Sequence, residues 1–123
     1  MGNISRNVPA LPSLARTAST NSGDLKNNDF KSAHIIIDVT AVTATGSLVF
    51  TVEGKDEVSG KYYTILESGA ITAVSTVVLG ITPGGQTGAN LRVNDTLPLD
   101  YRISVAHANA VSMTYSVGVN LLR

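Results

Sequence analysis

Apolar and polar residues alternate with a period of two along most of the chain after residue 33. The run from Val111 to Leu121 is the clearest, because every second residue in it is large and apolar and the residues between are Ser, Thr, Gly or Asn. Side chains of a β-strand point alternately to opposite faces. The pattern therefore predicts a strand with one buried and one exposed face.

The same alternation predicts several further strands, and β-branched residues favour another within 71–81. The inward-facing positions in the alternating runs are predicted to be Ile35, Ile37, Val39, Ala41, Leu48, Phe50, Val52, Tyr63, Ile65, Tyr101, Ile103 and Val105. No window after residue 32 shows a helical stripe. About six or seven short strands joined by turn-rich loops predict an all-β fold, either an antiparallel β-sandwich or a jelly-roll-like barrel.

The first 32 residues have a different composition, rich in Asn, Ser, Pro and Gly. We interpret 1–32 as an extended N-terminal arm or linker and 33–123 as the sandwich domain. A short run at 14–20 can add one edge strand. The segment 1–11 has neither helical nor strand periodicity, so we expect it to lack order in an isolated monomer and to gain order on a neighbour's surface.

Residues 48–67 read as a hairpin with a charged tip. The tip, Gly54 to Gly60, is most simply a solvated loop, since a turn must leave its backbone polar groups in water. Two functional alternatives are a carboxylate pair formed by Glu53 and Glu67, and a loop that docks on a partner. Tyr62 and Tyr63 are adjacent, so one is expected to face the core and the other to serve as an exposed interface anchor.

Composition narrows the class of function. The 123 residues carry nine basic and nine acidic side chains, so there is no excess of positive charge to attract nucleic acid or an anionic membrane. The chain has no cysteine, which excludes disulfide bonds. No apolar run approaches the roughly 20 residues of a membrane helix, and no signal peptide is recognisable, so we expect a soluble protein made in the cytoplasm. Charged residues are only 15% of the chain, which suits an assembly component with buried surfaces as well as an ordinary domain of low charge.

The sequence contains no motif typical of a catalytic, metal-binding or phosphate-binding site. His34 and His107 are the only histidines, and their spacing matches no metal-ligand pattern. No Gly-x-Ser-x-Gly elbow occurs, and the loop PGGQTGAN lacks the Gly-Lys-Ser/Thr of a phosphate cradle, so it is expected to be a flexible turn. We therefore predict a protein that is not an enzyme and has no cofactor and no metal.

Two stretches resemble a family of small structural proteins from tailed-bacteriophage virions. They are FTVEGKDEVSGKYYTILESGAIT and DYRISVAHANAVSMTYSVGVNLL, and the resemblance covers about residues 33 to 122. It implies a β-sandwich built into a phage particle, most simply a decoration or cement protein on the head. The implied partners are the major capsid protein and copies of the chain itself, as a trimer or dimer, and the implied location is the surface of the phage head.

Two other functions stay open on the sequence alone. One is a tail tube, tip or adaptor component, and the other is a surface glycan-binding module that uses PGGQTGAN and the Gly54 to Gly60 loop. For the decoration protein, deletion of residues 1–16 is expected to leave the sandwich folded and to weaken attachment to the particle. The candidate partner-binding residues are Arg6, Pro9, Pro12, Arg16, Lys55, Asp56 and Tyr62.

Overall fold

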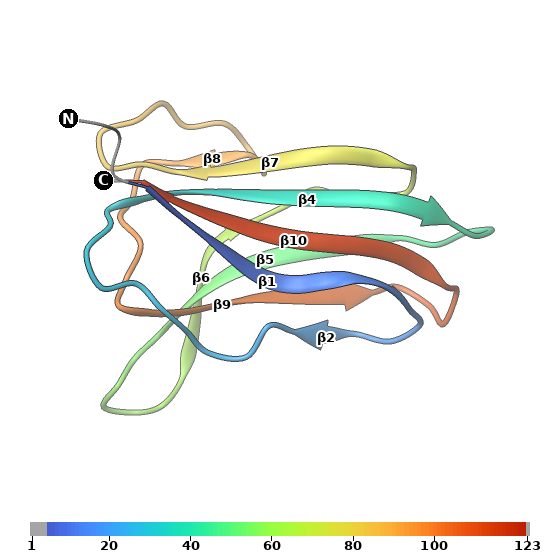
Figure 1. The fold of residues 1–123 in the computed structure, drawn as a ribbon, viewed down its shortest axis with the longest axis horizontal. Coiled ribbons are helices and arrows are strands. Elements are labelled where there is room, and N and C mark those ends of the chain that lie inside the picture. The colour runs from blue at the N-terminus through green and yellow to red at the C-terminus, as the bar shows by residue number, and fades with distance from the viewer. Residues whose placement is uncertain (1–4, 123) are drawn as a thin grey trace.

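The protein is an all-β sandwich, described here from a computed structural model over residues 5–122. One sheet, sheet A, has the strand order β1-β10-β4-β7-β8, and the other, sheet B, has the order β2-β9-β5-β6, with β3 also paired to β9. The two sheets pack face to face (Figure 1). The strands are β1 (Ser5–Arg16), β2 (Thr20–Asn21), β3 (Leu25–Lys26), β4 (Ser32–Val42), β5 (Leu48–Lys55), β6 (Tyr62–Glu67), β7 (Ser75–Ile81), β8 (Arg92–Val93), β9 (Asp100–His107) and β10 (Met113–Leu122).

The core lies between the sheets and is built from the alternating runs. Along β10, buried and half-buried residues alternate from Met113 to Leu122 without interruption. The rings of Phe50 on β5 and Tyr115 on β10 meet edge to face, with centroids 5.3 Å apart, and so join the two sheets. The predicted antiparallel sandwich is confirmed; the short pairing of β7 with β8 is parallel.

Three predicted core positions, Ala41, Tyr63 and Ile65, are not fully buried, and a β-bulge explains Ala41 and Ile65. Ala41 is exposed, because Val39 pairs with Tyr115 while Ala41 already pairs with Thr114. The extra residue on β4 shifts the alternation by one. In the same way, the pairing of β5 with β6 skips Ile65, so that Leu66 is buried and Ile65 is only partly buried against the core.

The N-terminal segment is extended, as predicted, but Ser5–Arg16 forms a full strand of sheet A. β1 spans Ser5–Arg16 and pairs with β10 along its length, whereas the sequence predicted an edge strand only at 14–20 and no order for 1–11. Residues 1–4 of that prediction lie outside the described residues. Register shifts beside Ala10 and Leu11 break the alternation, which explains why strand periodicity is invisible there. Both residues are buried in the core.

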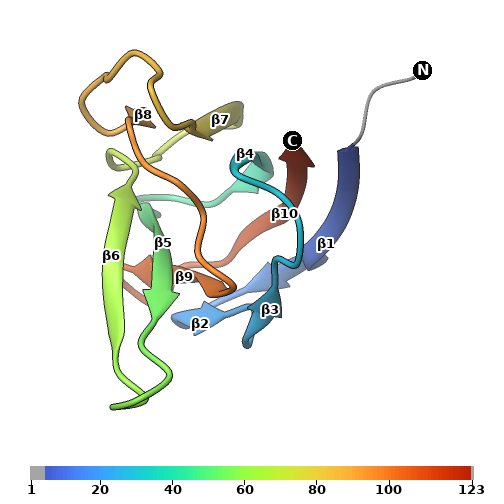
Figure 2. The same cartoon turned by 90° about the vertical axis from the view of Figure 1, so that its left-hand side faces the viewer.

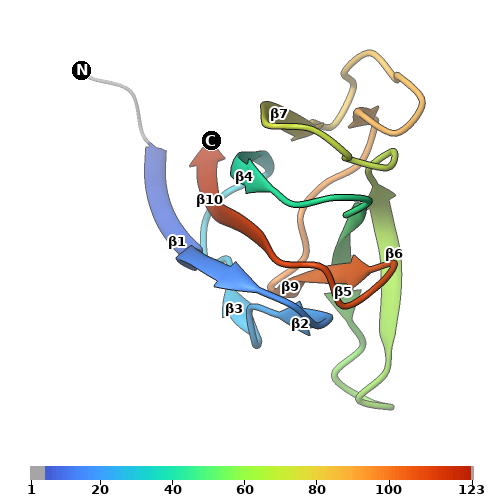
Figure 3. The ribbon, with the colours of Figure 1, turned by 90° about the vertical axis from the view of Figure 1, so that its right-hand side faces the viewer.

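The loops project at different sides of the sandwich. The hairpin between β5 and β6 and the long connection from β7 to β8 lie at opposite ends in Figure 2. Figure 3, from the other side, shows β1 running along β10 at the edge of sheet A. The edges and loops, together with the outer faces of the two sheets, are the surfaces that remain for function.

Candidate functional site

The outer faces of the two sheets differ in chemistry. In sheet A, β10, β4 and β7 present mostly small or neutral side chains to the outside, with the acidic residue Asp38 among them. We call this surface the neutral face. It consists of Thr114, Ser116, Gly118, Ile36, Asp38, Thr76 and Val78.

The register brings the residues of the neutral face into rows across three strands. Ser116 pairs with Asp38, and Asp38 pairs with Thr76, whose hydroxyl donates to the Asp38 carboxylate at 3.2 Å. The next row joins Gly118, Ile36 and Val78. Val78 is 47% exposed. A surface of small side chains with an apolar middle and few charges can be covered by another protein at little desolvation cost.

Sheet B carries an ionic cluster on its outer face. Arg102 on β9 donates from Nε to the Glu53 carboxylate at 2.8 Å, and its guanidinium lies 3.5 Å from the centroid of the Tyr62 ring. The Tyr62 hydroxyl in turn donates to Asp24, which also accepts from Lys55 Nζ at 2.9 Å. The cluster therefore ties β5, β6 and β9 to the segment between β2 and β3.

The hydrogen bonds of this cluster fix its charge states. The Tyr62 hydroxyl, and after it the Lys55 ammonium, lowers the pKa of Asp24. The same carboxylate raises the pKa of Lys55 and the pKa of Tyr62. At neutral pH Asp24 and Lys55 are therefore ionised and Tyr62 is neutral, and the three side chains satisfy one another.

The β5–β6 tip is a solvated hairpin loop, as the sequence predicted. Asp56 accepts from the Val58 amide at 3.2 Å and from the Ser59 hydroxyl at 2.8 Å, and Gly60 has a φ of 74°. These hydrogen bonds, that from Ser59 first, lower the pKa of Asp56. Its side chain thus holds the turn together, and the apolar side chain of Val58 at the tip is 96% exposed.

The expectation that one of the two adjacent tyrosines faces the core is wrong. Neither ring enters the core: Tyr62 lies half-buried against Arg102, and Tyr63 is 49% exposed beside Gly54. A Cβ added to Gly54 would lie 2.4 Å from the Tyr63 ring, so the glycine makes room for that ring. Tyr63 occupies the strand position opposite Gly54, at the end of the strand pair.

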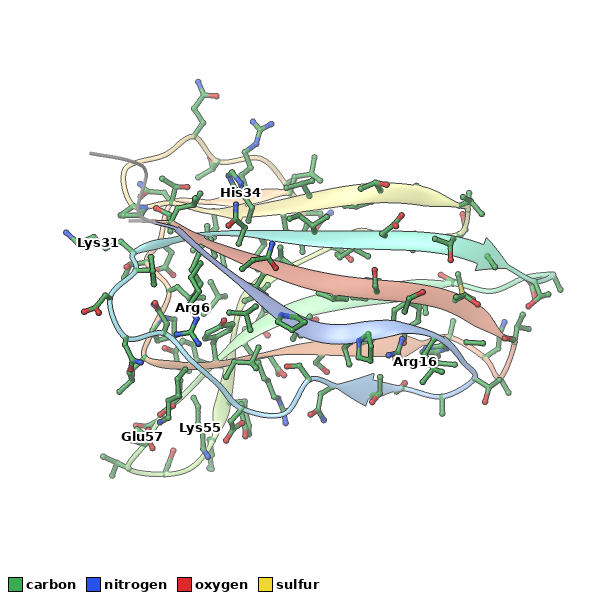
Figure 4. All side chains as sticks on the ribbon, in the orientation of Figure 1. Arg6, Arg16, Lys31, His34, Lys55 and Glu57 are labelled. Atoms are coloured by element: carbon green, nitrogen blue, oxygen red, sulfur yellow. The ribbon has the colours of Figure 1, made fainter. Side chains whose placement is uncertain are left out.

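Of the predicted site residues on β1, one makes structural contacts and three are exposed. The Arg16 guanidinium donates to the carbonyls of Pro12 at 2.7 Å and of Tyr115 at 2.9 Å, and lies 4.7 Å from the Tyr115 ring centroid. It therefore fastens β1 to β10. Arg6, Pro9 and Pro12 are exposed, and Figure 4 places Arg6 and Arg16 at separate points along the strand.

The predicted site residues do not form one site. Lys55 and Tyr62 meet in the ionic cluster, Arg16 contacts Pro12, and the two groups lie on different sheets. Sequence reasoning missed Asp24 and Arg102, which complete the cluster. Arg102 lies directly opposite Glu53 in the register, a relation that the linear charge pattern does not contain.

Three other residues considered for catalysis or metal binding, Glu53, Glu67 and His107, have hydrogen-bond or ion-pair partners within the protein. Glu53 is paired with Arg102, while Glu67 accepts a long hydrogen bond from the Thr51 hydroxyl at 3.5 Å, so each carboxylate has its own neighbour. His107 Nε2 lies 2.8 Å from the Tyr115 hydroxyl. Among residues 5–122, no cluster of three metal-ligating side chains occurs.

Comparison with family models, with curated proteins and with solved structures gave no match. Within the described part of the chain, no helix has the length and apolar character needed to cross a membrane. The functional argument therefore depends on the surfaces described above.

Proposed function

We propose that the protein is a structural component of a tailed-bacteriophage virion, and specifically a decoration protein that binds the assembled head through the neutral face. The observation that carries the proposal is the contrast between the two outer faces. On sheet B, Asp24, Lys55, Glu53 and Arg102 pair with one another in the ionic cluster, whereas the neutral face as defined above contains one acidic residue, Asp38. The resemblance of residues 33–122 to small phage virion proteins is the reason for proposing a phage head as the particle to which the protein binds.

A rigid sandwich with such a face suits binding to a repeated lattice. A ligand that binds the assembled shell more tightly than free subunits stabilises the shell by mass action. Many identical weak contacts, or self-association of the decoration protein as a trimer or dimer, then add through multivalency. The partner in this proposal is the major capsid protein, and the location is the outer surface of the head.

The direct test adds the purified full chain to heads that lack it. The proposal predicts saturable binding with a fixed number of copies per head and a higher temperature of shell rupture. Copies would be counted by quantitative gel densitometry, and rupture followed by the release of packaged DNA. Failure to bind heads at any concentration would contradict the proposal, and rings in negative-stain micrographs would favour the tail component instead.

A further inference from the structure

A hollow of about 310 Å³ lies at the end of sheet A and shares Val78 with the neutral face. It is an open depression lined by residues of β4, β7, β8 and the loop from β7 to β8, which rises above these strands in Figure 2. The residues that give it chemical character are His34, Val78, Gly80, Thr82, Gln86 and Arg92. Its volume is at the small end of the range for ligand pockets, about 300 to 1,000 Å³, and accommodates one sugar ring.

The strand register creates this hollow. His34 pairs with Gly80, and Gly80 pairs with Arg92, so the three residues form one row across β4, β7 and β8. Neighbouring strands are about 4.8 Å apart, which places His34 and Arg92 roughly 10 Å from each other. Gly80, between them, contributes no side chain and leaves a gap. A Cβ at Gly80 would lie 3.6 Å from Arg92 Cγ, so sterics do not demand the glycine there.

The loop that forms the wall of the hollow is held in place. The Gly84 amide donates to Asn94 Oδ1 at 2.6 Å, the Gly85 amide donates to the Thr82 carbonyl at 3.2 Å, and the Arg92 amide donates to the Gly88 carbonyl at 2.9 Å. The segment expected to be a flexible turn thus has its own internal hydrogen bonds. A site that is formed before binding avoids much of the entropy cost of ordering.

The side chains of the hollow form a complementary set of hydrogen-bonding groups. The His34 imidazole, the Arg92 guanidinium, the Thr82 hydroxyl and the Gln86 amide have no hydrogen-bond or ion-pair partner among residues 5–122. No carboxylate lines the hollow, and Val78 adds an apolar wall. Figure 4 shows His34 at this end of sheet A.

We propose that the hollow binds a small hydroxylated carboxylate of the size of one acidic sugar. A guanidinium donates two parallel hydrogen bonds to a planar carboxylate. The amide and hydroxyl of Gln86 and Thr82 suit ring hydroxyls, and the row from His34 to Arg92 spans the ring. Val78 belongs to both the hollow and the neutral face. The ligand can nevertheless be tested without particles, so a failure of this proposal is distinguishable from a failure of head binding.

The test is an NMR titration of the full ¹⁵N-labelled chain with D-glucuronate. We expect saturable shifts of the Gly80, Gly85 and Arg92 amides, and at least tenfold weaker effects with D-glucose, acetate or inorganic phosphate. Arg92→Gln removes the guanidinium and Gly80→Leu fills the hollow, and each should weaken binding at least tenfold. Lys61→Gln, in the β5–β6 loop, is the control and should bind normally.

Several outcomes would overturn the assignment. They are the absence of saturable shifts in the wild type, equal binding of glucose, acetate or phosphate, and unchanged affinity in Arg92→Gln. A spectrum with native dispersion must accompany each variant. If Gly80→Leu fails to fold, Arg92→Gln decides the question alone, because its side chain is exposed.

Discussion

At the scale of single residues, the Tyr101 hydroxyl is the least satisfied group of the core. The side chain is fully buried between the sheets, and the hydroxyl has no hydrogen-bond partner among the described residues. Burial, the largest effect, raises the pKa of Tyr101 to about 12. A buried polar group without a partner costs about 1 to 3 kcal/mol of folding free energy.

Tyr101→Phe should therefore raise the free energy of unfolding by about 1 kcal/mol, measured by urea denaturation. Tyr115→Phe is the matched control and should lower it by about 1 kcal/mol, because that hydroxyl bonds with His107. Destabilisation by Tyr101→Phe would show that the hydroxyl has a partner in the folded protein.

Burial of Tyr101 also makes the free energy of unfolding depend on pH in the alkaline range. The folded-state pKa of Tyr101, about 12, lies above the ordinary value of 10.0, so the folded state holds this proton more strongly than the unfolded state. The free energy of unfolding is therefore highest below pH 10 and falls as the pH rises through 12. The wild type should lose stability across this interval more steeply than Tyr101→Phe, in denaturation measured at stepped pH. Parallel curves for the two proteins would contradict this account.

His107 has the opposite effect: it makes the free energy of unfolding fall as the pH is lowered. Burial, and secondly the Arg16 charge, lowers the pKa of His107 below 6.5. The folded state prefers the neutral imidazole, so the stability it contributes is present above pH 6.5 and is lost as the pH falls through the folded-state pKa. His107→Gln should lose less stability than the wild type between pH 7 and pH 5, measured by thermal unfolding. An equal loss in both proteins would exclude His107 as the group responsible.

At the scale of elements, β1 makes the N-terminal segment part of the sandwich and not a separate arm. It contributes Ala10 and Leu11 to the core, and Arg16 fastens it to β10. Deletion of residues 1–16 would expose the whole edge of β10. We therefore replace the expectation of a folded deletion protein with one that unfolds or aggregates, as judged by circular dichroism and light scattering. A monomeric deletion protein with an unchanged melting temperature would restore the picture of a dispensable arm.

The prolines of β1 protect the edge of sheet A. Pro9 and Pro12 have no amide hydrogen to offer an added strand, and the register shifts beside them bend the edge. The double variant Pro9→Thr with Pro12→Thr should self-associate more strongly than the wild type in sedimentation velocity. Ala15→Thr, at an exposed position of the same strand, is the control. Equal sedimentation of both variants and the wild type would show that the prolines have no protective effect.

The sequence predicts the strands whose alternation is unbroken and fails where bulges occur. Residues such as Ile37, Val52 and Ile103 are buried as expected, because burial of one face imposes the period of two. Ala41 and Ile65 were misplaced, since a bulge depends on pairing across strands rather than on the composition of one strand. β1 was missed for the same reason.

The candidate surfaces were only partly predictable. The charged hairpin drew attention to Lys55 and Tyr62, and both belong to the ionic cluster. Asp24 lies far from them in sequence, and Arg102 reaches them only through the register of β5 with β9. The row of His34, Gly80 and Arg92 likewise depends on which strands are neighbours, which periodicity does not reveal.

At the scale of the whole molecule, the sandwich separates two kinds of surface. The charges of sheet B are largely committed to internal contacts, and the neutral face of sheet A has almost none to desolvate. The central claim is that the neutral face, and not sheet B, meets the phage head. Ser116 on β10 and Ser104 on β9 are half-buried, outward-facing serines on the two sheets, so a lysine at each makes a matched pair.

The most direct measurement is the number of copies bound per head for the wild type, Ser116→Lys and Ser104→Lys at equal concentration. The account predicts that Ser104→Lys binds like the wild type and that Ser116→Lys loses at least nine-tenths of the bound copies, since a charge would have to be desolvated in the contact. Both variants should melt within a few degrees of the wild type. Full binding by Ser116→Lys, or no binding by the wild type, would contradict the account.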